Sequence, residues 1–326
     1  MNSKVKRVIC LSHSKDVDGL CSAAIVKMVQ GGETVLSDYN DLIEKLAEID
    51  DVEKLYVCDL GLNHKNQDDF LRHMSRLSKK GEVEYIDHHP LAEEFKEKIE
   101  SAGVKLTHST EESCSILVFK RFQHEVSKIT SMIAAFGAIG DFMDFRPIAS
   151  EIIEGFDRLF LLFETTVLSH AIAKKNKDRD TLVEFVTRLS EGELPHMMNK
   201  VIEYAAQHAS TVSEIMIQVQ KNGKTMKNLS FIRTDQGPLG SVASLLLGAF
   251  GLSVGIALKS EEGFTEISGR ATSRFQKHLG KMMADLSSQL GGYGGGHARA
   301  SGARIPSTNS EKFLFLLDEG LEETNE

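Results

Sequence analysis

The chain has 326 residues, a formal net charge of −9 and 41% hydrophobic residues. This length suffices for two domains with hydrophobic cores, and the composition is that of a globular protein. The negative charge argues against binding nucleic acid by charge alone, although metal ions and a local basic patch would still permit a nucleotide substrate.

Strand patterns alternate with helical patterns over residues 1–148. The expected strands are Arg7–Ser12, Thr34–Ser37, Leu55–Cys58, Val83–Ile86 and Val104–Thr107, and the expected helices are Gly19–Gln30, Asp41–Ile49, Asn66–Lys79, Glu112–His124 and Lys128–Ala138. Alternation of this kind predicts an α/β fold, with a parallel sheet and helices on both of its faces.

Residues 149–220 have a helical pattern with one charged interruption at Lys174–Asp180, and we expect them to form a helical connector. After the turn residues Lys221–Lys224, strands and helices mix again, which predicts a smaller mixed α/β domain over residues 221–326. The strands expected there are Leu229–Arg233, Val254–Lys259 and Phe264–Arg270, and the helices are Leu239–Phe250 and Gln276–Leu290.

The cysteines and the N-terminus both favour a cytoplasmic protein. No pair of cysteines has Cys-x-x-Cys spacing, so we expect four buried, reduced thiols. These are Cys10, Cys21, Cys58 and Cys114. The apolar run Val8–Leu11 is too short for a signal peptide and reads as the first strand.

One uncharged segment, Gly237–Leu258, is long enough to span a bilayer. Its glycines and serines favour a helix, a turn at Gly251 and a buried strand instead. We therefore expect no membrane span.

Ionisable residues follow three strands of the first domain. The first strand leads into His13, Asp16 and Asp18, the third into Asp59, and the fourth into Asp87, His88 and His89. Parallel strands end along one edge of a sheet, where ligands bind, so we expect these side chains to converge. Carboxylates that close repel one another unless a cation neutralises them. Asp and His side chains suit Mn²⁺ or Mg²⁺, and a carboxylate bridging two ions would suit phosphoryl hydrolysis.

Each of these groups also has an ordinary structural interpretation. Asp16 and Asp18 could cap the helix that follows, and Asp59 could be a turn residue. The pair His88-His89 could be an exposed strand end. Their joint occurrence at three strand ends favours the metal site. Asp141 is a weaker candidate, because Gly140-Asp141 could simply end the preceding helix.

The segment Gly291–Gly302 reads GGYGGGHARASG. So many glycines imply unusual backbone angles or a very close contact. Backbone N–H groups in such a loop, opening onto a helix, would cradle an anion. Residues 268–306 contain one acid, Asp285, against six basic residues, which favours anion binding over a flexible linker. The basic residues are Arg270, Arg274, Lys277, Lys281, Arg299 and Arg304.

In this order the motifs resemble those of the DHH phosphoesterase superfamily. They are His13-x-x-Asp16-x-Asp18-Gly19, Asp59, Asp87-His88-His89, Gly140-Asp141 and Gly-Gly-Gly-His297. The C-terminal part resembles the DHH-associated domain of RecJ-type nucleases and of nano-RNase or pAp-phosphatase proteins. The resemblance covers nearly the whole chain except the helical middle.

The resemblance implies a role for each motif residue. Two Mn²⁺ ions, with Mg²⁺ or Co²⁺ as substitutes, would be held by His13, Asp16, Asp18, Asp59, His88 and Asp141, and Asp59 would bridge both ions. His89 would face the substrate phosphate, and Asp87 would orient a histidine. In the second domain Arg270 would contact a phosphate. The nucleotide would be held by Gly295, Gly296, His297 and Arg299.

The function that the resemblance implies is a Mn²⁺-dependent phosphodiesterase or exonuclease. Two metals would activate a water, and the second domain would position the nucleotide. The substrates would be short oligonucleotides, or single-stranded RNA or DNA cut from an end. The absence of Trp, and Tyr293 as the one aromatic residue of the glycine segment, favour short ones.

Several alternatives stay open at this point. Cyclic dinucleotides and the 3′-phosphorylated nucleotide pAp would suit the same centre. A non-catalytic scaffold that binds nucleic acid is a second class of function, but the complete set of acidic ligands favours catalysis. The helical middle could build a homodimer. Neither the preference for RNA or DNA nor the direction of degradation follows from the sequence.

Overall fold

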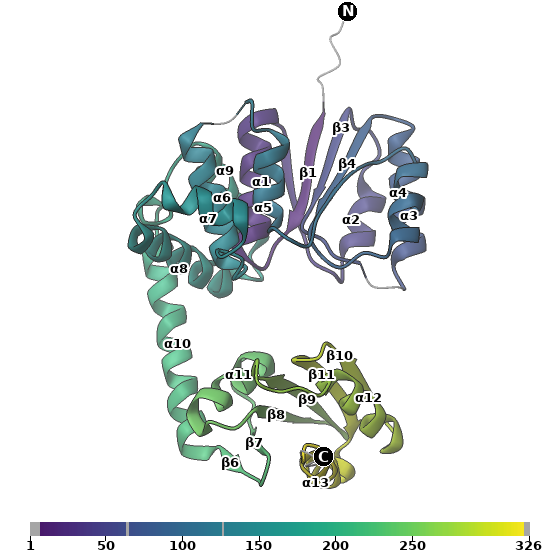
Figure 1. Ribbon diagram of the computed structural model, residues 1–326, viewed down its shortest axis with the longest axis vertical. Coiled ribbons are helices and arrows are strands. Elements are labelled where there is room, and N and C mark those ends of the chain that lie inside the picture. The colour runs from purple at the N-terminus through teal and green to yellow at the C-terminus, as the bar shows by residue number, and fades with distance from the viewer. Residues whose placement is uncertain (1–6, 63–64, 126, 323–326) are drawn as a thin grey trace, which may run out of the picture. The chain divides into compact units, whose positions relative to one another are not determined.

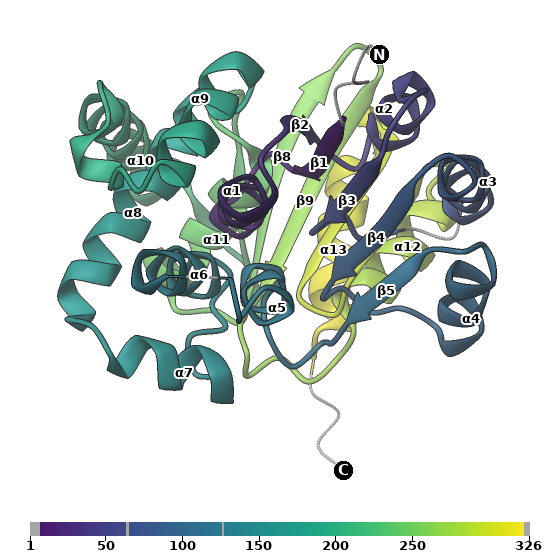
Figure 2. The same ribbon diagram turned by 90° about the horizontal axis from the view of Figure 1, so that it is seen from above.

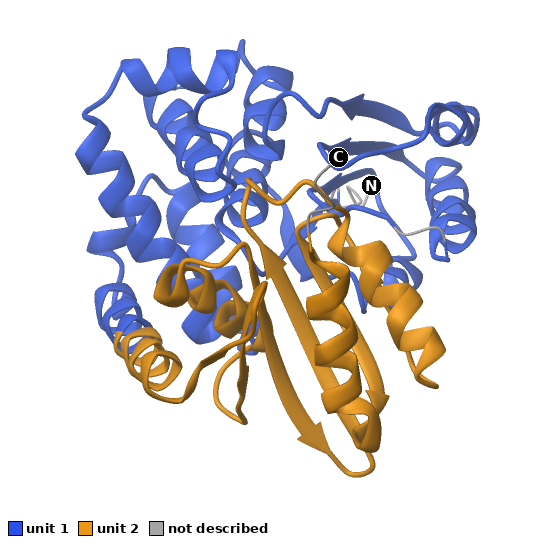
Figure 3. Ribbon diagram, turned by 60° about the horizontal axis from the view of Figure 1, so that its bottom comes forward, with its two compact units in different colours: residues 1–209 blue, residues 210–326 orange. Residues whose placement is uncertain are grey.

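A computed structural model describes residues 7–62, 65–125 and 127–322 of the chain (Figure 1). The chain divides into two compact units, residues 1–209 and 210–326 (Figure 3). The first contains a parallel sheet covered by helices, and the second contains a mixed sheet, so the predicted α/β fold is confirmed.

The sheet of the first unit has five parallel strands in the order β2-β1-β3-β4-β5. Their bounds are β1 Val8–His13, β2 Glu33–Ser37, β3 Lys54–Cys58, β4 Glu82–Asp87 and β5 Lys105–His108. All five strands were expected from the sequence, and each bound differs from the expected one by at most one residue.

Successive residues of a strand point to opposite faces, so each strand contributes to two hydrophobic cores. In β1, Cys10 belongs to the core on one face, whereas Ile9 and Leu11 belong to the core on the other. Figure 2 shows α1 and α5 on one side of the sheet, and α2, α3 and α4 on the opposite side. The helices are α1 Val17–Gln30, α2 Leu42–Glu48, α3 Gln67–Ser78, α4 Glu93–Ser101, α5 Cys114–Arg121 and α6 Lys128–Gly140.

Most of the predicted helical connector packs onto the first unit. Leu161, Leu168 and Phe185 lie in the same core as α1 and α6. The elements concerned are α7 Pro147–Glu154, α8 Arg158–Lys175, α9 Arg179–Ser190 and the short 3₁₀ helix Pro195–Met197. The next helix, α10 (Val201–Asn222), begins in the first unit and continues into the second.

The second unit has a six-stranded sheet in the order β10-β11-β9-β8-β7-β6. Only β7 and β8 pair in parallel. The strands are β6 Lys224–Thr225, β7 Leu229–Arg233, β8 Val254–Glu261, β9 Phe264–Ala271, β10 Tyr293–Gly296 and β11 Ala300–Pro306. The helices are α11 Leu239–Phe250, α12 Leu279–Gln289 and α13 Ser310–Gly320, and a 3₁₀ turn spans Ser307–Asn309.

The uncharged segment Gly237–Leu258 is divided as expected from its glycines. Helix α11 ends at Phe250, Gly251 adopts a left-handed conformation with φ of 69°, and β8 begins at Val254. Within the described residues, no helix combines the length and apolar character that a membrane span requires. All four cysteines are buried and none forms a disulfide.

Candidate metal centre and nucleotide-binding segment

The ends of β1, β3 and β4 coincide along one edge of the first sheet. Ser12 pairs with Cys58, and Cys58 pairs with Ile86, so the residues that follow these positions emerge side by side. This register brings His13, Asp59 and the stretch Asp87–His89 to the same edge of the sheet, which is the edge expected to bind ligands.

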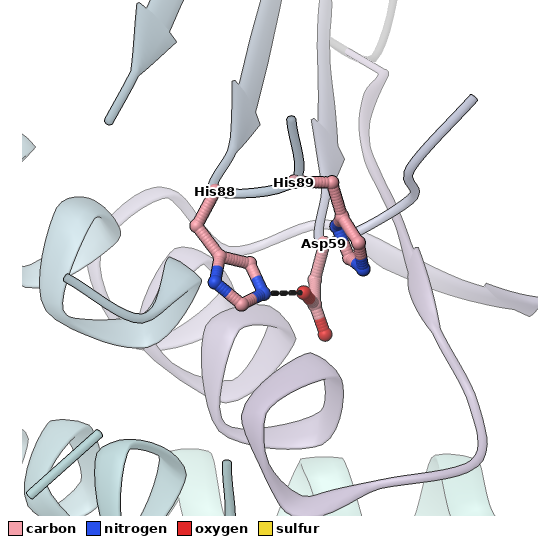
Figure 4. A group of neighbouring side chains, drawn as sticks. All are labelled: Asp59, His88 and His89. Carbon is pink, nitrogen blue, oxygen red and sulfur yellow. Dashed lines mark ion pairs between the residues drawn. The ribbon is translucent and has the colours of Figure 1, made fainter. Parts of the chain in front are cut away.

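The imidazole of His88 lies at the middle of the cluster. Its Nε2 is 3.2 Å from Oδ1 of Asp59 and 3.6 Å from Oδ2 of Asp141. Figure 4 shows the carboxylate of Asp59 pointing toward His88, with His89 beside them. Among the described residues, two groups have ligand atoms within 4.8 Å of one another: Asp59 with His88 and His89, and Asp18 with His88 and Asp141. Carboxylate oxygens with imidazole nitrogens are a donor set that fits a divalent ion.

Asp59 owes its position to an unusual backbone angle. Its φ is 58°, in the left-handed region that Asp, Asn and Gly tolerate best. The backbone N–H of Asp59 still donates to the carbonyl of Ile86, at 3.1 Å. The chain therefore leaves the strand sharply at this residue, and its buried side chain turns toward His88.

His13 and Asp16 form a separate pair, 3.3 Å apart between His13 Nε2 and Asp16 Oδ2. The other carboxylate oxygen of Asp16 accepts from the N–H of Gly19 at 2.9 Å, so Asp16 does cap α1. His13 is buried, and its Nδ1 has no hydrogen-bond partner among the described residues. A buried nitrogen without a partner fits a metal ligand, but these two residues do not belong to either group around His88.

Asp18 is held at the start of a distant helix. Its carboxylate accepts from the N–H of Cys114 at 2.7 Å and from the N–H of Ser115 at 3.0 Å, both in the first turn of α5. Gly137 in α6 leaves the space for this arrangement, because a Cβ there would lie 2.5 Å from Oδ1 of Asp18. The three segments are far apart in the sequence, which contains no local signal for this contact.

Asp87 orients His89. Asp87 is buried, and its Oδ1 is 2.9 Å from Nδ1 of His89. Its Oδ2 accepts a hydrogen bond from the backbone N–H of His89 at 3.2 Å. A carboxylate at Nδ1 favours the tautomer that carries its proton there, so a neutral His89 presents the lone pair of Nε2. Gly61 lies against the ring, since a Cβ at that position would approach Cγ of His89 to 2.6 Å.

Tyr39 is a site residue that the sequence analysis misses. Its hydroxyl is 3.1 Å from Nε2 of His89, and its ring stacks on His13 with centroids 4.8 Å apart. Tyr39 also lies just after the end of a parallel strand, as the other site residues do, because Asp38 and Tyr39 follow the end of β2. The sequence contains no signal for Tyr39, because tyrosine is not one of the Asp and His residue types that marked the other strand ends.

Burial and mutual repulsion dominate the electrostatics of the cluster. Burial, followed by the charges of Asp16 and Asp18, raises the pKa of Asp59 and brings the pKa of Asp141 to about 7. Burial also lowers the pKa of His88. Burial opposes protonation of His89, but its hydrogen bond to Asp87 together with the negative charges of Asp87, Asp141 and Asp16 outweighs that effect and raises its pKa. Crowded carboxylates of this kind gain most from a bound cation.

Arg270 lies on β9 in the second unit, half-buried against α11. Its Nη1 donates to the carbonyl of Gly269 at 3.0 Å and to Ser268 Oγ at 3.3 Å. A Cβ on Gly240 would approach Nη2 to 2.4 Å, so this glycine in α11 makes room for the guanidinium. Burial lowers the pKa of Arg270.

The glycine-rich segment differs from the expected loop that opens onto a helix. It forms β10 and a turn into β11, and the neighbouring helix α12 precedes it. Gly295 and Gly296 have φ of 154° and 133°, and a Cβ on Gly296 would lie 2.6 Å from the carbonyl of Ala300. Glycine is therefore required here because two backbone segments of a hairpin approach each other closely. The segment continues into strand β11 and not into a helix.

The turn of this hairpin lies next to Arg270. Ala300 pairs with Arg270 across β11 and β9, and the N–H of His297 donates to the carbonyl of Ala300 at 2.8 Å. His297 and Arg299 are exposed, and Arg299 Nη2 donates to the carbonyl of Ser273 at 3.4 Å. The predicted nucleotide-binding residues of the second unit thus lie at one end of its sheet.

Comparison with protein families gives two matches that together cover most of the chain. Residues 6–140 match the DHH family, N-terminal domain, and residues 226–323 match the DHHA1 domain. The comparison with curated proteins yielded no match.

Several solved structures share the fold over 97% of this chain. A pGpG-specific phosphodiesterase from Vibrio cholerae is 13% identical, is covered over 99% of its length and has a TM-score of 0.66. A manganese-bound exonuclease RecJ is 14% identical, with 90% coverage and a TM-score of 0.67. The DHH domain of a member of the s1p family of ribosomal proteins is 16% identical, with 87% coverage and a TM-score of 0.70.

Proposed function

Because residues 6–140 match the DHH family, N-terminal domain, and residues 226–323 match the DHHA1 domain, we propose that the chain is a divalent-metal-dependent phosphodiesterase. Its proposed substrates are short oligonucleotides, or single-stranded RNA or DNA degraded from an end. The observation that carries the proposal is the cluster around His88, where Asp18, Asp59 and Asp141 converge and none of these three carboxylates forms an ion pair with a Lys or Arg of the described residues. A structural cluster would be expected to contain its own neutralising cation.

The proposed metal is Mn²⁺. The residues that would hold it are Asp18, Asp59, His88 and Asp141, with His13 and Asp16 beside them. A bound divalent ion supplies Lewis-acid chemistry, which lowers the pKa of a water and offsets negative charge on a phosphate. Asp59 is the proposed shared ligand of two ions, since its carboxylate lies nearest to His88 and is almost fully buried.

His89 is the proposed contact for the scissile phosphate. Its Nδ1 is held by Asp87, so its Nε2 can either donate a proton to a phosphate oxygen or accept one from a hydroxyl. The raised pKa of His89 favours the protonated ring, which would donate to the phosphate. Asp87 would act through His89 as a positioning residue and would not touch the substrate.

The second unit would hold the neighbouring nucleotide. The guanidinium of Arg270 suits a phosphate oxygen, and the hairpin turn with Gly295, Gly296 and His297 would receive the base or ribose. Arg299 would add a second cation at the same end of the sheet. With Tyr293 as its one aromatic residue, the glycine segment offers little stacking surface, which favours short substrates.

The test is a substrate panel with Mn²⁺, comparing RNA and DNA from two-mers to twenty-mers with cyclic dinucleotides and pAp. We expect mononucleotides to be released from the shortest RNA or DNA at the highest rate. The matched variants are Asp59→Asn, which suits the left-handed backbone and removes a charged ligand, and Glu94→Gln, which removes an exposed acid of α4.

Asp59→Asn should reduce kcat/KM by at least about a thousandfold, because it removes a ligand that both ions would share. Glu94→Gln should leave kcat/KM unchanged. Release of nucleotides from no member of the panel, by protein that binds Mn²⁺, would overturn the proposal and support the non-catalytic scaffold. Full activity of Asp59→Asn would remove Asp59 from the centre.

A further inference from the structure

The second unit contains a cavity of 370 Å³ that none of the proposed substrate-binding residues lines. Three basic side chains, Lys227, Arg274 and Lys277, contribute to its wall. Arg274 and Lys277 belong to the basic stretch at residues 268–306, and the proposed function gives them no role. A volume of this size is within the range of small-molecule sites, which is about 300–1,000 Å³.

The wall of the cavity combines positive charge with apolar surface. No acidic side chain lines it within the described part of the chain, and Leu252, Phe275 and Leu321 form its apolar portion. Phe275 and Leu321 are anchored in the hydrophobic core of the unit, so this surface is preformed. Cationic groups beside an aromatic and aliphatic wall match the two ends of a nucleotide, namely phosphate and base.

Two of the three basic residues have polar partners at residues 320–322. The ammonium of Lys227 pairs with the carboxylate of Glu322, and Lys277 Nζ donates to the carbonyl of Gly320 at 3.0 Å. Arg274 is exposed and makes no ion pair or side-chain hydrogen bond with a described residue. The described carboxylates near these three basic groups are those of Glu322 and Asp318, and Asp318 accepts from the backbone N–H groups of Asn228 and Leu229. Three cations against two carboxylates leave a positive site for which an added anion can compete.

A buried hydroxyl without a partner lies next to the same loop. The N–H of Thr272 donates to the carbonyl of Ser253, a lining residue, at 3.0 Å, whereas Thr272 Oγ1 is buried with no partner among the described atoms. Buried hydroxyls are normally hydrogen-bonded, so this one marks an incomplete polar site beside the cavity.

We propose that this cavity is a second nucleotide site, which binds a nucleoside monophosphate. Its phosphate would contact Arg274 and Lys227, and its base would lie against Phe275 and Leu252. The carboxylate of Glu322 occupies the phosphate position at Lys227 when no ligand is bound. If the proposed phosphodiesterase activity also holds, a mononucleotide product is the natural ligand, and the site would respond to product.

The test measures equilibrium binding of 5′-AMP to the full chain in EDTA, so that neither the metal centre nor turnover contributes. Binding is measured on the original protein and on Arg270→Ala, which disables the proposed substrate site, and the variants below are made in the Arg270→Ala background. We expect binding of 5′-AMP to persist and to be tighter than that of adenosine or inorganic phosphate alone. A failure of the phosphodiesterase proposal would leave this result unchanged.

Variants then locate the site. Lys227→Ala combined with Arg274→Ala should weaken binding by at least about tenfold, since each removes a charge-assisted contact. Glu322→Gln should strengthen binding a few-fold by removing the competing carboxylate. Lys312→Ala, which removes one exposed charge from α13, should change nothing.

Three results would overturn the proposal. Equal affinity of the double variant and Lys312→Ala would place the ligand elsewhere. Loss of all binding on Arg270→Ala alone would assign the nucleotide to the β9 end of the sheet. Equal affinity for phosphate and 5′-AMP would mean that the apolar wall does not contact the base.

Discussion

At the residue scale, the arrangement of Asp87, His89 and Tyr39 shows how side chains beside the metal ligands are fixed. Asp87 lies at Nδ1 of His89, and the hydroxyl of Tyr39 lies at Nε2. Asp87 also accepts from the hydroxyl of Tyr85 at 3.1 Å, so this carboxylate is fully used in positioning. The imidazole therefore has one orientation before any substrate binds.

Asp87→Asn tests this positioning role. The variant should lower kcat about 10- to 100-fold, because an amide neither stabilises the protonated imidazole of His89 nor holds its orientation firmly. Mn²⁺ affinity should stay close to that of the original protein, which titration calorimetry would check. A loss of Mn²⁺ binding as large as the loss of kcat would make Asp87 part of the metal centre itself.

The pKa of Asp141 predicts how stability depends on pH in the absence of metal. Burial and the neighbouring carboxylates raise this pKa to about 7, against an ordinary value of about 3.9. Between about pH 4 and pH 7 the folded protein then binds more protons than the unfolded chain, so the free energy of unfolding falls as the pH rises. The stabilising effect of protonated Asp141 is lost above its folded pKa.

Thermal unfolding in EDTA would measure this effect as the difference in Tm between the original protein and Asp141→Asn, which removes the titration of Asp141 and keeps every histidine. The Tm of the original protein should fall relative to the Tm of the variant as the pH rises from about 5 to about 8. Added Mn²⁺ should restore it at the higher pH, because the ion binds the ionised carboxylates. A difference that does not vary with pH would contradict the raised pKa.

At the scale of elements, the close approach of α6 to α1 and α5 determines where Asp18 can lie. A Cβ at Gly137 would come within 2.1 Å of Ser115 Oγ and 2.5 Å of Asp18 Oδ1. Gly137→Ala should therefore destabilise the protein by about 1–3 kcal/mol through overpacking and should weaken Mn²⁺ binding by displacing Asp18.

Gly248→Ala in α11 is the matched control for that helix substitution. A Cβ there meets no atom within 4 Å, so the change should stabilise the protein by about 0.5–1 kcal/mol through a lower entropy of the unfolded chain. Denaturant unfolding of both variants would compare the two effects. Equal stability changes for the two alanines would mean that α6 can shift away from Asp18.

The local pattern of each element explains which helices and strands the sequence could predict. Strands β1 to β4 are largely buried runs, so period and turn residues locate them, and the shared edge of β3 and β4 locates Asp59 and His88. Strand β5 is short and has no fully buried residue. Helix α4 is missed because it buries only Phe95 and Ile99 among charged residues. Strand β10 is missed because glycines have no side chains to show the alternation of a strand.

The residue pattern points to the site mainly through the strand ends, whereas Asp141 follows helix α6 and gives only a weak signal by itself. Asp16 illustrates how two interpretations of one residue can both apply, since it caps α1 and also lies 3.3 Å from His13. The contact of Asp18 with α5 depends on tertiary packing, as does that of Asp38, which accepts from Arg179 of α9 at 3.3 Å. Contacts between segments so distant in the sequence have no local pattern.

At the scale of the whole molecule, helix α10 links the two compact units without a break. The boundary between the units falls at residues 209 and 210, inside this helix. Ser210→Pro would remove a helical hydrogen bond and kink α10, at a local cost of about 3 kcal/mol. We expect kcat/KM on a short oligonucleotide to fall, because the proposed substrate contacts come from both units.

Mn²⁺ affinity should be unchanged in Ser210→Pro, since every proposed metal ligand belongs to the first unit. Ser210→Ala keeps the helix intact and serves as the control. Undiminished kcat/KM in the proline variant, with circular dichroism showing a perturbed helix, would mean that turnover does not depend on the geometry of α10.

The left-handed backbone at Asp59 has a consequence for how this chain can change in evolution. Only a few residue types fit a φ of 58° without strain, and Asn and Gly are among them. Both are a single-nucleotide change from an aspartate codon. A descendant could therefore lose its proposed shared metal ligand while keeping its fold, and we expect inactive relatives of this lineage to carry Asn or Gly at this position.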